Sequence, residues 1–93
     1  MKIEEVLSER QRTHGSFESV AETAQALKAI IHHAPAMDRV RCAGDTMPPQ
    51  YLEALDLIAT KIARICHGNP DEPDHWLDIQ GYAMLAAMRS HDD

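Results

Sequence analysis

Residues 61–86 read KIARICHGNPDEPDHWLDIQGYAMLA, and this stretch decides the fold. Apolar residues recur at helical spacing on both sides of a short polar link. Gly68 and Pro70 are typical of a helix end, and the acidic residues of 71–74 suit the first turn of a new helix. The stretch therefore predicts two helices joined by a short connection.

The same spacing continues outward from this pair. Between residues 17 and 31 apolar side chains recur at three- and four-residue steps, and Ser16 before them can cap a helix. Pro48 and Pro49 are tolerated in a first helical turn and favour a start there. We expect helices over residues 2–11, 16–33, 48–67 and 72–89, with residues 34–47 mostly in a loop.

The composition supports one small helical domain. The chain has 93 residues, which argues for a single domain over residues 1–93. Aromatic residues make up only 4%, so Ala, Leu, Ile and Met must supply the core. We expect an all-α fold, with a short N-terminal helix plus three main helices in a small bundle. The helices at 48–67 and 72–89 are apolar over most of their surface, which predicts a homodimer or a higher homo-oligomer.

One apolar stripe on the helix at 48–67 is expected to lie in the core or between the core and a subunit interface. Its members are Leu52, Leu55, Ala59, Ile62 and Cys66. We interpret Cys66 as a core residue, because the cysteines and histidines show neither a C-x-x-C nor an H-x-x-x-H spacing that would predict a zinc site.

Charge and hydropathy narrow the function classes. The net charge is −6, which argues against non-specific binding to nucleic acid, since that needs Lys and Arg to neutralise phosphates. The first residues do not resemble a signal peptide, and no apolar run approaches the roughly 20 residues that span a bilayer. We expect a cytoplasmic protein with reduced cysteines and no membrane partner.

Two pairs of carboxylates stand at helical spacing. Glu53 and Asp56 are three residues apart and Asp74 and Asp78 are four apart, so each pair shares a helix face. Oxygen ligands from two helices suit Mg²⁺. The sequence therefore suggests Mg²⁺ as a cofactor, held by these four residues.

Asp78 stands out because its neighbours one turn away are mostly apolar. We expect this carboxylate to point inward and to need a cation or a metal as partner. Lys61 and Arg64, one helix earlier, are the candidates. A structural ion pair that fixes the helix register, a phosphate or metal site, and a solvated surface all stay open as interpretations.

The segment RTHGSF, residues 12–17, offers a second candidate for anion binding. A glycine beside a helix N-terminus leaves backbone N–H groups free for an anion, and Arg12 and His14 would add positive charge. An ordinary turn at the entry of a helix is the alternative.

Four motifs together resemble a known family. They are R-x-H-G-x-F at 12–17, A-L-D-L-I-x-x-K-I-A-R-I at 54–65, G-N-P at 68–70 and D-x-W-x-D-I-x-G-Y-A at 74–83. Over residues 10–87 the chain is similar to a family of small helical proteins from bacteriophages and prophages without an assigned function. This resemblance implies the cytoplasm of a host cell as the location.

More distantly, the layout is similar to MazG-like all-α NTP pyrophosphohydrolases. Those enzymes use E-x-x-E on one helix and E-x-x-D on a later one to hold Mg²⁺ around a triphosphate. The first pair matches Glu53 and Asp56, while the second departs, because Asp74 and Asp78 are four apart and His75 stands where a carboxylate is expected. The resemblance implies a nucleotide site that is active or degenerate.

Two functions follow as hypotheses. The first is a phage or prophage protein that binds a nucleotide or phosphate ligand between its last two helices, with Lys61, Arg64, Arg12 and His14 on the phosphate; whether it hydrolyses the ligand is left open. The second is a non-enzymatic helical interaction protein, either an inhibitor of a host protein or a structural accessory. In that case Asp78 forms a structural ion pair with Arg64 or Lys61.

Overall fold

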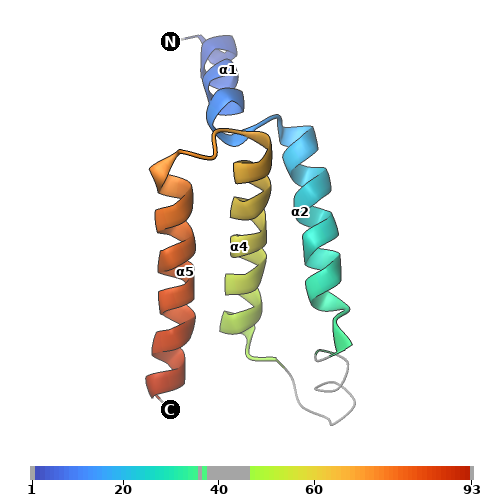
Figure 1. Ribbon diagram of the computed structural model, residues 1–93, viewed down its shortest axis with the longest axis vertical. Helices are drawn as coiled ribbons and strands as arrows, with labels where there is room; N and C mark the ends of the chain where they lie inside the picture. Colours follow the sequence, from blue (N-terminus) through green and yellow to red (C-terminus); the bar gives the residue numbers. More distant parts are fainter. Residues whose placement is uncertain (1, 36, 38–46, 93) are drawn as a thin grey trace.

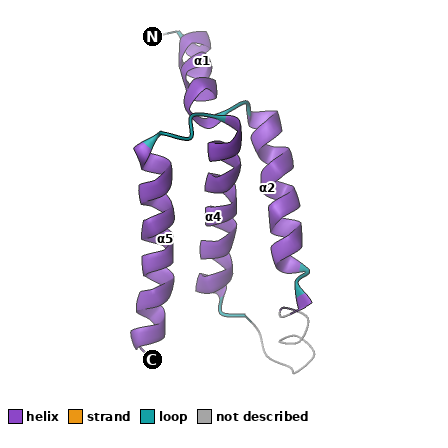
Figure 2. Cartoon of the chain, in the orientation of Figure 1, coloured by secondary structure: helices purple, strands orange, loops and turns teal. Residues whose placement is uncertain are grey.

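The computed structural model describes residues 2–35, 37 and 47–92, and within them the chain is helical and has no strand (Figure 2). The long helices are α1 (Ile3–His14), α2 (Phe17–His32), α4 (Pro49–His67) and α5 (Pro73–Asp92). This confirms the all-α prediction. Most of the loop predicted at 34–47 lies outside the described residues. No helix in the described ranges is long and apolar enough to cross a membrane.

The three longest helices stand side by side with α4 in the middle (Figure 1). α4 packs against α5 on one flank and against α2 on the other, and α1 lies at one end of this layer with fewer contacts. The central position of α4 agrees with its mostly apolar sequence. The end of the layer where α1 meets the link between α4 and α5 contains the candidate site.

Local signals in the sequence explain where most helices begin and end. The backbone N–H of Ser19 donates to the Ser16 hydroxyl oxygen at 3.2 Å, so Ser16 caps α2 as expected. Pro49 opens α4, and the N–H of Gly68 donates to the Arg64 carbonyl at 2.8 Å where α4 ends. α1 continues to His14, three residues beyond its predicted end, because Gly15 rather than an earlier residue terminates it.

Two glycines allow the turn after α1 to touch the end of α4. Gly15 has a φ of 85°, in the left-handed region that favours glycine. A Cβ at Gly15 would lie 2.6 Å from the His67 Cβ, and a Cβ on Gly68 would collide with the Thr13 carbonyl oxygen. Only residues without a side chain permit this approach of the two backbones.

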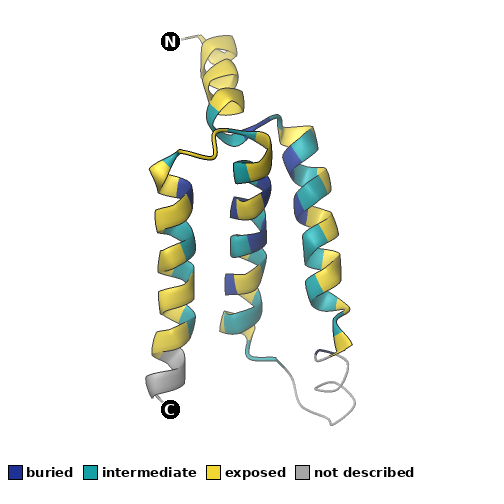
Figure 3. Ribbon diagram, in the orientation of Figure 1, coloured by how far each residue is buried: buried dark blue, intermediate teal, exposed yellow. Residues whose placement is uncertain are grey.

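The core differs from the predicted stripe. Val20 and Ala24 of α2 pack with Ala63 of α4, and Ala54 and Ala59 are buried as well (Figure 3).

The larger members of the predicted stripe are not buried. Leu55 is 38% and Ile62 39% exposed, and Cys66 is exposed too, so its assignment to the core was wrong. α4 is flanked on both sides by helices, and its buried positions are alanines and Lys61, while Leu55 and Ile62 stay partly exposed.

The molecule is open for its size. Its radius of gyration is 15.8 Å, while a compact domain of this length has a value of about 12 Å. The principal extents are 51 × 27 × 21 Å. A single layer of helices therefore leaves much of its apolar surface uncovered.

Candidate functional site at the junction of α1, α4 and α5

The junction is built on the carbonyl group of Thr13, in the last turn of α1. This oxygen accepts the backbone N–H of Asn69 at 3.0 Å and the Nε2–H of His75 at 3.1 Å. Asn69 belongs to the link between α4 and α5, and His75 lies in the first turn of α5. One carbonyl thus connects α1 with the segment that joins the two longest helices.

His75 is fully buried, and its ring lies against that of His14. The ring centroids are 4.9 Å apart, and the planes are inclined by 58°. The Nδ1 atoms of both rings are buried and make no hydrogen bond with the described part of the chain. Because the Nε2 of His75 donates to a carbonyl, its Nδ1 is a bare acceptor while the ring is neutral and becomes a donor when the ring is protonated.

An ion pair between α4 and α5 lies one turn further along α5. The Nζ of Lys61 is 2.6 Å from Oδ2 of Asp78, which confirms the predicted pairing of this carboxylate with a cation of the preceding helix. The environment differs from the prediction: the Asp78 side chain is 45% exposed, while that of Lys61 is only 10% exposed. The hydrogen bond from Lys61 lowers the pKa of Asp78, although partial burial acts in the opposite direction.

The junction is a positive region in an acidic chain. Burial lowers the pKa of His14, and the charge of Arg64, the neighbouring His75 ring and the charges of Lys61 and Arg10 lower it further. A position in the last turn of α1 would by itself favour a protonated histidine, so these effects outweigh the helix dipole. Arg64 is half-buried in the last turn of α4, and no ion pair with another described residue holds its guanidinium.

The four carboxylates predicted as Mg²⁺ ligands are not brought together. Asp56 faces α2, where its Oδ1 and Oδ2 atoms lie 3.0 and 3.1 Å from the Nε2 of His32. Asp78 faces Lys61 of α4, and Glu53 and Asp74 are exposed. Among the described residues, no three His, Cys, Asp or Glu side chains are grouped closely enough to hold a metal ion.

Comparison with known proteins gives a family but no function. A family model described as a domain of unknown function, DUF6378, matches residues 2–90. The chain belongs to the DUF6378 family. Neither the curated proteins nor the solved structures yield a match. The match covers α1, α2 and α4 completely and α5 almost completely, so the junction lies within the DUF6378 domain.

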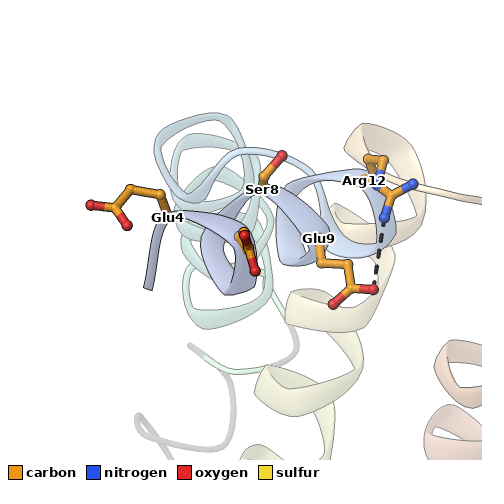
Figure 4. Close-up of a pocket in the computed structure, with 5 residues that line it drawn as sticks. Glu4, Ser8, Glu9 and Arg12 are labelled. Atoms are coloured by element: carbon orange, nitrogen blue, oxygen red, sulfur yellow. Dashed lines mark ion pairs between the residues drawn. The ribbon is translucent and has the colours of Figure 1, made fainter. Parts of the chain in front are cut away.

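Arg12 does not join the junction of this DUF6378 domain. Its side chain is 76% exposed and pairs with Glu9 at 3.8 Å, one turn earlier in α1 (Figure 4). The two residues line a shallow pocket together with Glu4, Glu5 and Ser8. Arg12 therefore lies among acidic side chains of α1 and not at the junction, unlike the other residues predicted to bind phosphate.

Sequence reasoning missed the contacts that His75 and His67 make. His75 was considered as a possible zinc ligand and as a departure from a carboxylate motif, although it stands three residues before Asp78 and therefore on the same helix face. His67, at the end of α4, lies 2.6 Å from the Thr23 hydroxyl of α2. Local spacing contains no sign of this second contact, because 44 residues separate its partners.

Proposed function

We propose that the DUF6378 domain binds a phosphate-bearing small ligand of the nucleotide class at the junction of α1, α4 and α5. The carrying observation is the contact between the half-buried His14 and the buried His75, whose buried Nδ1 atoms make no hydrogen bond within the described residues, near the positive charges of Arg64 and Lys61. A buried polar atom without a partner is costly, and a ligand oxygen would satisfy it.

Each side chain has a distinct part in this proposal. Arg64 supplies a planar fork of N–H donors that suits phosphate oxygens. Lys61 contributes positive charge, part of which its partner Asp78 neutralises. The imidazoles act as Nδ1–H donors once protonated, and an anion beside them favours that protonation.

The motifs noticed in the sequence support the same place. His14 comes from R-x-H-G-x-F, Lys61 and Arg64 from K-I-A-R-I, and His75 and Asp78 from D-x-W-x-D-I-x-G-Y-A. These motifs are spread over residues 12–83. The rings of His14 and His75 are in contact, Lys61 pairs with Asp78, and the charges of Arg64 and Lys61 act on His14, which supports the proposal. The phage or prophage origin and the likeness to MazG-like enzymes are part of this proposal and rest on the motifs alone.

Magnesium enters the proposal only as an ion that a nucleotide brings with it. Mg²⁺ is commonly held by the phosphates of the ligand and by one or two carboxylates. A grouped set of carboxylates is not needed for that role, and we propose binding without a claim of hydrolysis.

A thermal-shift screen tests the proposal. Wild-type protein is heated with inorganic phosphate and with a panel of nucleotides, each with and without Mg²⁺. A true ligand at a hundredfold excess over its Kd stabilises the protein by about 2.7 kcal/mol. Arg64→Ala should abolish the shift while Arg12→Ala, the matched control, retains it. If no nucleotide and no phosphate shifts the wild-type transition, the proposal is wrong.

A second candidate function has its own observation. Lys61 and Asp78 already satisfy each other as a structural ion pair, and large apolar side chains are exposed on every helix. These features favour a non-enzymatic helical interaction protein, either an inhibitor of a host protein or a structural accessory. Under this hypothesis Asp78→Asn lowers stability, and no nucleotide produces a thermal shift.

A further inference from the structure

α5 has two different faces. His75, Asp78, Ile79, Tyr82 and Ala86 recur at three- and four-residue steps, are buried or half-buried, and form the face toward α4. The opposite face contains Leu77, Gly81, Met84 and Met88, which we call the outer stripe of α5. Its large side chains are well exposed: Leu77 is 59%, Met84 54% and Met88 53% exposed.

The outer stripe has the spacing of a helix-packing seam. Its members follow one another at steps of four, three and four residues, as apolar positions do where two helices pack along each other. Gly81 lies in the middle, and a Cβ built there would meet nothing within 4 Å. A notch at Gly81 between Leu77 and Met84 lets another helix approach closely.

The stripe lies in an uncharged part of a charged chain. Residues 79–88 contain no Asp, Glu, Lys or Arg, although such residues make up 26% of the sequence. Depletion of charge, with Met and other apolar residues enriched, is typical of the buried centre of a protein interface. It also lets two chains of net charge −6 meet without bringing like charges into contact.

The exposed area has the size that a dimer requires. The accessible surface is 6738 Å², which exceeds the roughly 5,400 Å² of a compact monomer of this mass by about 1,300 Å². A standard interface removes about 800 Å² from each partner. One interface along α5 would therefore bury most of the excess accessible surface.

We propose that a second copy of this chain covers the outer stripe, with α5 packed against α5 across a two-fold axis. Such an axis pairs each stripe with itself, so a surface must be self-complementary. The outer stripe meets this condition, since the notch at Gly81 on one copy faces the large side chains of Met84 and Leu77 on the other. α2 and α4 then remain free on the far side of α5.

Sedimentation equilibrium on the full chain tests the inference. We expect a mass of twice 10.4 kDa at concentrations around 100 µM, with a monomer appearing on dilution. Met84→Glu and Leu77→Glu place an unpaired charge in the seam and should weaken association by at least about thirtyfold. Gln80→Glu is the matched control, because it adds the same charge to an exposed position of α5 outside the stripe and should leave the mass unchanged.

Two results would overturn the inference. One is a wild-type chain that stays monomeric up to millimolar concentration. The other is a dimer that Met84→Glu, Leu77→Glu and Gln80→Glu all leave equally intact. Circular dichroism measures whether each variant folds. We expect all of them to fold, because the substituted positions are exposed. Neither result bears on phosphate binding, because the junction lies on the other face of α5 and its test uses the thermal shift.

Discussion

The Nζ of Lys61 lies 2.6 Å from Oδ2 of Asp78, and the cation is the more buried partner of the two. Since an isolated buried charge is unfavourable, the main task of Asp78 in the fold is to compensate Lys61. The two positions should therefore respond differently to substitution, although they belong to one ion pair.

Asp78→Asn leaves the buried ammonium group of Lys61 without its counter-charge, and we expect the Tm to fall by several degrees. Lys61→Met removes the buried charge and keeps a similar volume, and a half-exposed Asp78 can be hydrated, so its Tm should stay close to that of the wild type. Thermal denaturation followed by circular dichroism measures both. Equal losses in the two variants would contradict the assignment of Lys61 as the partner that needs compensation.

The pKa of His14 should be visible in the dependence of stability on pH. Its pKa is lowered on folding, so the folded state binds fewer protons than the unfolded state near and below pH 6.5. The neutral ring therefore contributes stability above about pH 6.5, and this contribution is lost as the pH falls through the folded pKa. Urea denaturation at pH 7.5, 6.5 and 5.5 should show falling stability, and His14→Gln should flatten this trend. If the pH dependence is unchanged in His14→Gln, it arises from other titratable groups.

Phosphate binding at the junction should be coupled to proton uptake. An anion beside the imidazoles favours their protonated form, so it should raise the pKa of His14 from its lowered value. Proton NMR of the His14 ring, assigned with His14→Gln, measures the titration midpoint with and without saturating inorganic phosphate. An upward shift at His14, with no comparable shift at the exposed His33, is the expected outcome. Equal shifts at both rings would indicate only general screening by salt.

The helices could be predicted from the sequence because their signals are local. Ser16, Pro49 and Gly68 act on the turns beside them, and the predicted bounds of the last two helices agree with the structure within a few residues. The pairing of Lys61 with Asp78 was also within reach, because a carboxylate among apolar neighbours calls for a cation nearby.

The core and most of the site could not be predicted in the same way. The small bundle was predicted correctly, with Leu55 and Ile62 expected in its core or at a subunit interface, whereas α4 buries mainly its alanines within the chain and leaves these two side chains partly exposed. The contact of His14 with His75 depends on how the end of α1 meets α5. The spacing of residues along either helix does not predict this arrangement. Arg12 was grouped with His14 because the two are close in sequence, but side chains two positions apart on a helix point in different directions.

Gly68, in the link between α4 and α5, and Gly81, within α5, provide a matched test of the junction. Gly68→Ala would push a Cβ into the Thr13 carbonyl oxygen, which is backbone and cannot move aside cheaply. We expect a loss of at least about 2 kcal/mol in the free energy of unfolding, in the range of overpacked sites. Gly81→Ala adds the same methyl group to an exposed helix position where nothing lies within 4 Å, and it should stabilise the monomer by about 0.5–1 kcal/mol. Urea denaturation at low micromolar concentration measures both without interference from association, and a neutral Gly68→Ala would contradict the close approach of α1 to the link before α5.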